Sequence, residues 1–342
     1  MHVNPPFYLR ETFSQEVLNL LNSVTLGSSG ARYRHRNIDK RIENLYRPLF
    51  LNLERNERVL GNITLCRRKE AWYIRYFAFD PAKQSAVKTK SKNRPASGRL
   101  KNMINDFFDN VLNDGESGSE CLYAYIDPRN ERSMWMSENF GFRKAASIAS
   151  QTFSRVKPKK KTRVIRAGDR TFIKQKVKEV FADYPLYFDH HTFNETPFYE
   201  LIKDGETVGF AKTHSAEWVI ERLPGKKGRM LINIIPFVPG VRKVVRPKAH
   251  HFTVVDTVWL KDPNAGDFEE LMEGILEKEG KNTLIWWVDK KEPLYVSLEN
   301  RVNWGLLHKI NGVQDVNLAV KRSDKDESVF NRPTYVTGYD FI

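Results

Sequence analysis

The order of predicted elements repeats once along the chain, and this repetition constrains the fold more than any other feature. In the first half, the strands "RVLGNITLCRRK" and "AWYIRYFAFDP" precede a lysine-rich loop, a helix, the strand "CLYAYI", a helix in "NERSMWMSEN" and a strand near "AASIASQTF". In the second half, "ELIKDGETVGFAKTH" and "HHFTVVDTVWLKDP" correspond to this strand pair, and Gly209 takes the place of Gly61. "TLIWWVDKKE" answers "CLYAYIDPRN", pairing Asp289 with Asp127, and a helix ending in "NWGLL" answers "NFGF". The sequence predicts an internal duplication.

Each predicted half contains one strongly amphipathic helix. Its apolar residues recur at intervals of three and four, which is typical of a helix packed on one side. The stripes are Leu100, Met103, Ile104, Phe107, Phe108, Val111 and Leu112 in the first half, and Phe268, Leu271, Met272, Ile275 and Leu276 in the second. With 342 residues and 40% hydrophobic side chains, the chain can build two cores. We expect an α/β (α+β) protein with domains at 1–156 and 164–342, joined by a basic linker at 157–163.

The positive charge lies in the first half and the linker. Residues 1–156 hold 25 Lys/Arg against 16 Asp/Glu, or +9, and the linker "KPKKKTR" adds +5, whereas residues 164–342 hold 26 of each. This field would attract an anionic partner, whether nucleic acid, a membrane surface or a phosphorylated small molecule.

Several other classes of site are not expected. The two cysteines, Cys66 and Cys121, lie in strand-like segments and are predicted to be core residues. The pairs His190-His191 and His250-His251 have no accompanying ligand cluster, so no metal is expected. With neither a long apolar run nor a signal peptide, the chain is expected to be cytoplasmic.

The order of elements, a helix entered from a basic Gly-containing loop, and the pattern N-x-x-S-x-x-x-S-x-x-F-G-F at 130–142 together resemble the GNAT superfamily of N-acetyltransferases. The resemblance implies two GNAT-like domains, each with a mixed, mostly antiparallel twisted sheet flanked by helices. It also implies acetyl-CoA as cosubstrate.

The first half carries the positions that correspond to the family's cofactor contacts. The loop "NRPASG" and the helix start after it correspond to the family's pyrophosphate loop, because unpaired N–H groups and the helix dipole stabilise a phosphate there. An ordinary surface turn with a helix cap is the alternative. The resemblance also places the pantetheine arm along the strand "YFAFD", and Asn130 at a cofactor contact or a helix cap. The implied cofactor residues are Phe77, Ala78, Phe79, Asn93, Arg94, Pro95, Ala96, Ser97, Gly98, Arg99 and Asn130.

The second half lacks the basic loop. Only "NAG" precedes its helix, and Asp267, Glu269 and Glu270 crowd the helix start, where carboxylates would repel a pyrophosphate. We therefore expect this half to have lost cofactor binding and to shape the substrate cleft.

The candidate catalytic residues are indicated by position alone. The segment "ARYRHRNIDKRIENLYR" lies where the family often lines its acceptor site, so His35 and Glu43 are candidate general bases. Aligned on Asn130 and Gly141, Ser137 takes the position of the family's Tyr general acid, but a Ser hydroxyl is a far poorer acid.

The leading hypothesis is an acyl-CoA-dependent N-acyltransferase that acts on a small-molecule or peptide amine. The alternatives are a non-catalytic CoA-binding or protein-interaction module and a basic protein associated with nucleic acid. The leading hypothesis expects a monomer whose halves form an intrachain pseudo-dimer, with no membrane partner.

Overall fold

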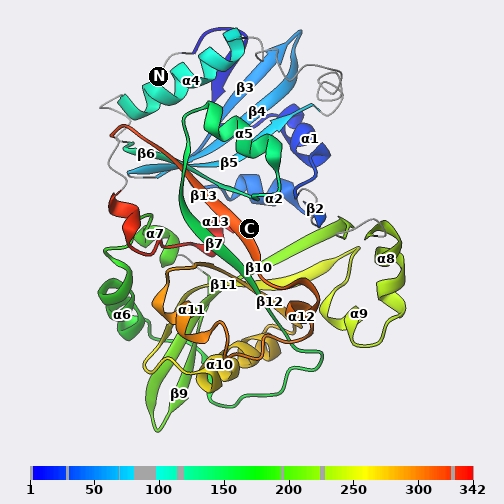
Figure 1. The fold of residues 1–342 in the computed structure, drawn as a ribbon, viewed down its shortest axis with the longest axis vertical. Helices are drawn as coiled ribbons and strands as arrows, with labels where there is room; N and C mark the ends of the chain where they lie inside the picture. The colour runs from blue at the N-terminus through cyan, green and yellow to red at the C-terminus, as the bar shows by residue number, and fades with distance from the viewer. Residues whose placement is uncertain are drawn as a thin grey trace. The chain divides into compact units, whose positions relative to one another are not determined.

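The computed structural model describes residues 3–27, 31–68, 70–80, 98–113, 119–193, 196–223, 228–324 and 328–341, without the side chains of residues 229 and 231. The chain divides into two compact units (Figure 1). Unit 1 comprises residues 1–145 and 317–326, and unit 2 comprises 146–316 and 327–342. Among the helices described, none is both long and apolar enough to cross a lipid bilayer.

The sheet of unit 1 has the strand order β1-β3-β4-β5-β6-β13. Its pairs are antiparallel except for the parallel pair β5 and β6. The strands of this unit, with the separate short strand β2, are β1 (Phe7–Arg10), β2 (Arg32–His35), β3 (Pro48–Arg55), β4 (Arg58–Arg67), β5 (Ala71–Phe79), β6 (Cys121–Ile126) and most of β13 (Gln314–Arg322).

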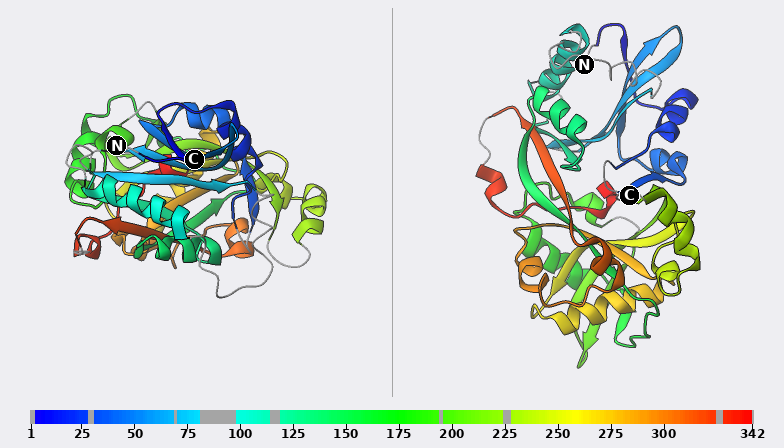
Figure 2. Two further views of the ribbon diagram at one scale, coloured as in Figure 1. Left: turned by 90° about the horizontal axis from the view of Figure 1, so that it is seen from above. Right: turned by 45° about the vertical axis from the view of Figure 1, so that its right-hand side comes forward.

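Helices cover both faces of this sheet (Figure 2). They are α1 (Gln15–Ser23), α2 (Ile38–Glu43), α4 (Gly98–Asn113) and α5 (Glu131–Asn139). The predicted stripe of α4 buries Ile104, Phe107 and Phe108 against strand residues such as Leu65 and Trp72, so the amphipathic prediction is confirmed. Helix α1 contacts β4 and β5.

Unit 2 repeats this plan with the strand order β7-β12-β11-β10-β9-β8. Again one pair, β11 and β12, is parallel and the other pairs are antiparallel. The strands are β7 (Arg143–Ser154), β8 (Val164–Arg166), β9 (Phe198–Lys203), β10 (Glu206–Arg222), β11 (His250–Leu260) and β12 (Thr283–Asp289).

The predicted stripe of α10 buries Phe268, Leu271 and Met272 in the main core of unit 2, while α6 covers a second cluster with Ile173 and Phe198. The helical segments are α6 (Thr171–Phe181), α7 (Asp189–Thr192), α8 (Gly228–Ile234), η2 (Ile235–Phe237), α9 (Val241–Val244), α10 (Ala265–Lys278), α11 (Pro293–Leu298), α12 (Leu306–Asn311), η3 (Ser328–Asn331) and α13 (Gly338–Phe341).

Strand register supports the predicted duplication. Gly61 pairs with Phe79, the last residue of β5, and Gly209 pairs with Leu260, the last residue of β11. A Cβ at Gly61 would lie 2.6 Å from the Phe79 ring, and one at Gly209 would lie 2.5 Å from Leu260 Cδ2. The same close packing therefore favours glycine at both positions, since a side chain there would require Phe79 or Leu260 to move.

The paired aspartates build matching turns. Asp127 Oδ1 accepts the backbone N–H of Arg129 at 2.9 Å, and Asp289 Oδ1 accepts that of Lys291 at 2.9 Å. In each case the next residue donates its N–H to the aspartate carbonyl, and a helix follows. Both turns are Asx-type, so the carboxylates fix the exit of β6 and of β12.

The compact units do not coincide with the predicted sequence halves. Strand β7 comes from the first sequence repeat but pairs with β12 over residues 148–154, within unit 2. Strand β13 comes from the second repeat but pairs with β6 over residues 317–322, within unit 1. Each repeat therefore completes the sheet of the other.

The segment 157–163, predicted as a linker, lies in unit 2 and contacts its own helix α10. Arg163 pairs with Glu270 at 2.6 Å and Lys161 with Glu273 at 3.3 Å. Helix α10 carries several carboxylates, so the basic run is held as part of the unit and its charge is partly neutralised.

The segment "NWGLL" differs from its prediction. Helix α11 ends at Leu298, and Gly305 precedes α12 rather than terminating α11. Gly305 has φ +91°, and a Cβ there would clash with the carbonyl oxygen of Ser154 on β7. By contrast, Gly141 does end α5, with φ +79° and an N–H donated to the carbonyl of Glu138.

We predict that Gly305→Ala destabilises the protein by about 1–3 kcal/mol more than Gly280→Ala, because overpacking against backbone adds to the cost of positive φ. Gly280 is a matched control, since it also has positive φ (+64°) but nothing within 4 Å of its Cβ position. Urea unfolding of the two variants measures the difference. Equal losses of stability would show that the contact with Ser154 imposes no constraint.

Candidate functional site

The parallel strands β5 and β6 separate after a short stretch of pairing. Only residues 71–73 pair with 121–123, although β5 continues to Phe79 and β6 to Ile126. A β-bulge at Arg75 in β5 lies just beyond the last pair. Bulges bend and twist a strand, so the bulge directs β5 away from β6. Beyond it, the edge of β5 that faced β6 is no longer part of the ladder between these two strands.

Strands β11 and β12 separate in the same register. They pair at 253–255 with 284–286, and a bulge follows at residues 257–258, where Thr257 has φ +50°. The alignment of the two repeats that matches Leu260 with Phe79 also matches Val254 with Tyr73. Each unit therefore has one divergence between its parallel strands.

The walls of the two divergences differ in exposure. In unit 1, Phe77, Phe79, Ala124 and Tyr125 are all partly exposed. The matching residues of unit 2 are Val258, Leu260, Trp286 and Trp287, of which only Trp287 is partly exposed. Of the two divergences, the one in unit 1 is the more accessible to a ligand.

A partly buried positive charge lies at the divergence of unit 1. Burial alone would lower the pKa of the Arg75 guanidinium, but Tyr76 and Tyr73 beside it hold that pKa above its ordinary value. Arg75 Cζ lies 5.5 Å from the centre of the Tyr76 ring. The guanidinium therefore stays charged behind the partly exposed wall.

Of the predicted pyrophosphate loop, Asn93, Arg94, Pro95, Ala96 and Ser97 lie outside the described residues. Gly98 and Arg99 begin α4 and are exposed, and among the residues that the structure describes, apart from its chain neighbours and its own helix backbone, no atom lies within 4 Å of a Cβ built on Gly98. The first turn of α4 contains no acidic residue. Lys101, one turn further along, donates to Asn139 Oδ1 at 2.8 Å and so joins α4 to the end of α5.

The side chains of Asn130 and Ser137 bond to the backbone of helix α5 itself. Asn130 is the N-cap, and its side-chain oxygen accepts the N–H of Ser133 at 3.1 Å. Of the two roles predicted for Asn130, the structure shows the capping one. Ser137 donates its hydroxyl to the carbonyl of Met134 at 2.8 Å, an i to i−3 bond that is frequent in helices.

The two candidate bases lie in different environments. His35 lines a small cleft beside Tyr76 of β5, and burial together with Arg41 and Arg75 lowers the pKa of its imidazole well below the ordinary value. Glu43 is the last residue of α2 and is exposed. The free volume of the cleft is about 10 Å³, close to the least that holds one water molecule. Its other lining residues are Leu21, Asn22, Val24, Leu26, Arg34 and Ile38.

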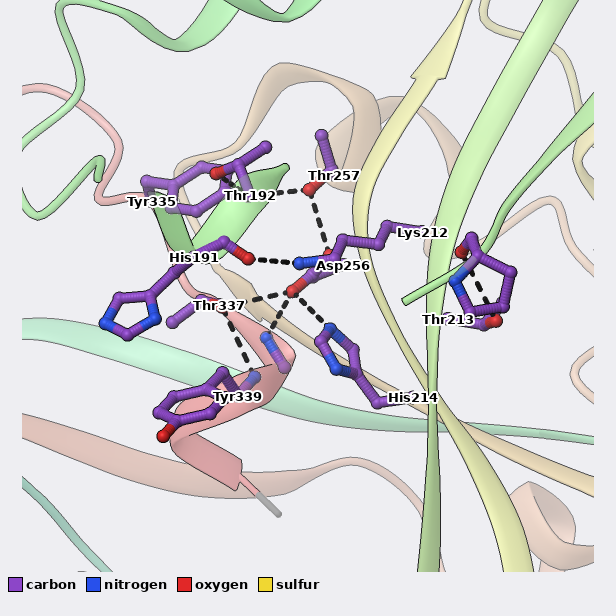
Figure 3. Close-up of polar contacts among 12 residues, drawn as sticks. His191, Thr192, Lys212, Thr213, His214, Asp256, Thr257, Tyr335, Thr337 and Tyr339 are labelled. Carbon is purple, nitrogen blue, oxygen red and sulfur yellow. Dashed lines mark hydrogen bonds and ion pairs between the residues drawn. The ribbon is translucent and has the colours of Figure 1, made fainter. Parts of the chain in front are cut away.

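Unit 2 has a buried polar cluster at the corresponding bulge, centred on Asp256 (Figure 3). Its Oδ2 accepts from His214 Nε2 at 3.1 Å, from the Thr337 hydroxyl at 3.2 Å and from the N–H of Gly338 at 2.5 Å. Its Oδ1 accepts from the Thr257 hydroxyl at 2.9 Å. The carboxylate is thus fully hydrogen-bonded, as a buried charge must be.

A buried lysine supplies the counter-charge. Lys212, on β10, donates Nζ to the carbonyl of His191, and burial lowers the pKa of its ammonium to about 8. Burial alone would raise the pKa of Asp256, but Lys212, His214 and the hydrogen bonds outweigh it and hold that pKa at about 2. At neutral pH the cluster therefore contains a carboxylate and an ammonium.

The last residues of the chain span the divergence of unit 2. The N–H of Thr334 donates to Asp289 Oδ2 at 2.8 Å, at the end of β12. Tyr335 lies 2.6 Å, hydroxyl to hydroxyl, from Thr257 on β11, and Gly338 binds Asp256 as described. The chain therefore bridges the two strands with its own hydrogen bonds, and Phe341 packs beside them.

The start of α10 is also unfavourable for binding an anion. Asn264 caps it by accepting the N–H of Asp267 at 2.8 Å, and Asp267 pairs with Lys203. Glu269 pairs with Arg155 at 2.9 Å. The acidic helix start that the sequence predicted is therefore present, and its carboxylates already have cationic partners.

Solved structures of acyltransferases share this arrangement of elements. A GCN5-related N-acetyltransferase from Sphaerobacter thermophilus superposes with a TM-score of 0.51 at 11% identity, over 94% of this chain and 97% of that one. A putative acetyltransferase from Pyrococcus horikoshii gives 0.52 at 10% identity, over 99% and 97%. N-myristoyltransferase from Saccharomyces cerevisiae, solved with bound myristoyl-CoA, gives 0.54 at 10% identity, over 94% and 80%. The chain has the tandem GNAT fold. No family model and no curated protein sequence matches it.

The tandem GNAT fold was predicted from motifs of its first copy, but the cluster around Asp256 was not. The one signal was a lone aspartate inside the apolar run "HHFTVVDTVWL", which calls for a buried partner. That partner, Lys212, stands in the strand "GFAKTH" and is equally isolated among apolar residues.

The two cysteines lie in the core, as the sequence predicted. Cys66 and Cys121 are both buried, and burial raises the pKa of Cys121 to about 12. His250 is buried and His251 is exposed, on opposite faces of β11. Within the described ranges, no three metal-ligating side chains form a group that could hold an ion.

We predict that Asp256→Asn lowers the free energy of unfolding by about 3 kcal/mol or more at pH 7, because it leaves the Lys212 ammonium buried without its counter-charge. Adding Lys212→Met should restore part of this loss, with a coupling energy of at least about 1 kcal/mol in the double-mutant cycle. Urea unfolding of the four proteins supplies the cycle, and strictly additive losses would rule out an electrostatic coupling between Asp256 and Lys212.

The same cluster predicts an acid sensitivity. The pKa of Asp256 is lower in the folded protein than its ordinary value of 3.8, so its contribution to stability is present above that pH. It should be lost as the pH falls from about 3.8 towards about 2. The unfolding midpoint of the native protein should therefore fall more steeply over this range than that of Asp256→Asn.

Proposed function

We propose that the chain is an acyl-CoA-dependent N-acyltransferase that binds its donor, expected to be acetyl-CoA, in unit 1 and transfers the acyl group to an amine. The accessible divergence of β5 and β6 carries this proposal. At this divergence, one edge of β5 no longer pairs with β6, and the residues beside it include partly exposed aromatic side chains. The long helix α4, which begins nearby, has no acidic residue in its first turn.

The backbone of β5 beyond the bulge suits an amide-containing arm. Residues 77–79 pair with β4 on one side, whereas the ladder with β6 on the other side ends at Tyr73. An extended ligand can add to such an edge as a further strand, along Phe77, Ala78 and Phe79. An N–H of the same edge can stabilise the oxyanion that develops on the thioester carbonyl.

The reaction requires few specialised groups. A neutral amine attacks the thioester carbonyl carbon, the carbon–sulfur bond breaks, and the amine proton leaves as the amide forms. The group that leaves is the thiolate, whose thiol has a pKa near 8.5, so it departs at neutral pH without a strong acid and then takes a proton from water. His35 is the proposed proton acceptor because it lies beside Tyr76 of β5; its lowered pKa keeps the imidazole neutral but makes it a weak base.

A non-catalytic CoA-binding module is the second candidate. Two observations favour it: the cleft beside His35 has little free volume, and the Ser137 hydroxyl is engaged within α5. Both candidates predict donor binding, and only the first predicts acylation of an amine. Turnover of a panel of small-molecule and peptide amines, with acetyl-CoA and with myristoyl-CoA as donors, separates them.

We predict one donor per chain and at least a tenfold loss of affinity in Gly98→Asp, because the added carboxylate places negative charge at the start of α4. Gly98 is exposed with open space around it, so the fold should tolerate the change. Isothermal titration with acetyl-CoA measures both quantities.

Gly266→Asp, at the start of α10, is the matched control and should leave donor affinity unchanged. Two equivalent sites per chain would contradict the assignment to unit 1. Unchanged affinity in a folded Gly98→Asp protein would remove the helix start from the site.

We predict that Ser137→Ala lowers kcat less than threefold on any amine that is accepted. The Ser137 hydroxyl is bonded to its own helix, so we do not expect it to act as the general acid. Loss of a true general acid typically lowers the rate by about 10² to 10⁴. Steady-state kinetics at saturating donor test this. A tenfold fall in kcat with unchanged donor affinity would instead assign a catalytic proton transfer to Ser137.

A further inference from the structure

Unit 2 contains an insertion that unit 1 lacks. In unit 1, β4 ends at Arg67 and β5 begins at Ala71, whereas in unit 2 β10 ends at Arg222 and β11 begins at His250. The described part of the insertion consists of α8, η2 and α9, near the ends of β10 and β11 (Figure 1). Since unit 1 forms the same divergence without these elements, the insertion is not required by the fold.

Apolar side chains of the insertion point into solvent. Phe237 is 81% exposed and Met230 50%, and Ile234 and Val238 are also exposed. We call these four residues the apolar tip. Single exposed apolar residues are common on protein surfaces, but four within nine positions form a group that favours a binding role.

The insertion is anchored by a different set of residues. Val244 and Val245 are buried in a cluster with Leu307, against which Ile220 and Ile235 also pack. The hydroxyl of Thr283 donates to the carbonyl of Val244 at 2.6 Å. The base of the insertion is therefore fixed to the unit, and the exposure of the apolar tip does not reflect a missing core.

The apolar tip has a restrained backbone. Phe237 stands between Pro236 and Pro239, and Gly240 follows with φ +84°. The N–H of Val238 donates to the carbonyl of Ile235 at 3.1 Å. Because proline fixes its own φ, the aromatic ring is presented with little backbone entropy to lose on binding.

Basic residues accompany the apolar tip without acidic ones. Residues 222–255 contain eight Lys/Arg and no Asp or Glu. Arg242, Lys243, Arg246 and Lys248 are exposed in the described part. The acidic residues that precede this stretch lie on β10, where Glu217 is 3.3 Å from His251.

We propose that this insertion docks the protein on an anionic phospholipid surface. Exposed aliphatic and aromatic side chains partition into the boundary between headgroups and acyl chains, and adjacent lysines and arginines bind anionic headgroups. Nucleic acid would use the same charges, but Phe237 is the one aromatic side chain among the four residues of the apolar tip, and the other three side chains suit lipid better than stacked bases. The positive charge of the sequence allowed a membrane surface as partner, but the leading hypothesis expected none; peripheral docking needs no long apolar run.

Sedimentation of the full chain with vesicles tests the proposal. The protein should bind vesicles of phosphatidylcholine mixed with phosphatidylserine, bind phosphatidylcholine alone much less, and lose binding as salt is added. Phe237→Ser combined with Met230→Ser should lower partitioning of the protein onto the vesicles at least about tenfold, because two apolar side chains no longer insert into the lipid. Arg242→Glu combined with Lys243→Glu should abolish the preference for the anionic vesicles.

The matched control is Val296→Ser combined with Val329→Ser, which removes exposed apolar side chains of unit 2 outside the insertion and should leave binding unchanged. Thermal unfolding checks that all variants remain folded. Equal partitioning of the Phe237 and Met230 variant would overturn the proposal. So would binding to a DNA duplex but not to vesicles, or a dimer in solution that this variant dissociates.

Discussion

The early end of pairing between two parallel strands is the constraint on which the rest of the structure depends. A backbone N–H or carbonyl that loses its ladder partner must find another partner or water, since leaving it buried and unpaired costs free energy. The bulge at Arg75 ends the ladder of β5, and the bulge at Thr257 ends that of β11. What lies beside the freed edge then decides what each unit can do.

The two units resolve this constraint with opposite charges. By sequence offset Asp256 corresponds to Arg75. Arg75 is the unpaired residue of the bulge in β5, whereas Asp256 pairs with Lys212 immediately before the bulge in β11. The cation in unit 1 stands behind a partly exposed wall, where it suits an anionic or polarised ligand. The anion in unit 2 binds the N–H of Gly338 and so holds the end of the chain across the strands.

The sequence predicted the fold well because duplication shows in local patterns. The stripes of α4 and α10 follow the helical period, and the glycines at 61 and 209 and the aspartates at 127 and 289 stand at matching positions of the two repeats, so each can be recognised in a short stretch of sequence. Local sequence patterns could not predict that β7 and β13 each pair within the sheet of the other repeat. A strand has the same alternation of side chains whichever neighbour it pairs with, so its partner is a property of the assembled sheet.

The site was less predictable for the same reason. Asn130 has one side-chain oxygen, and only the structure shows that it caps α5. Lys212 and Asp256 are 44 positions apart, and their interaction depends on the register of β10 against β11. The segment around Tyr335 carries no motif, because its role lies in backbone donors and one hydroxyl that fit a gap between strands.

The exchange of β7 and β13 also makes the two repeats depend on each other. Without β13, strand β6 would be an edge strand with a row of unpaired backbone groups, and without β7 the same would hold for β12. Loss of either donated strand would therefore open a sheet edge on which another chain could pair.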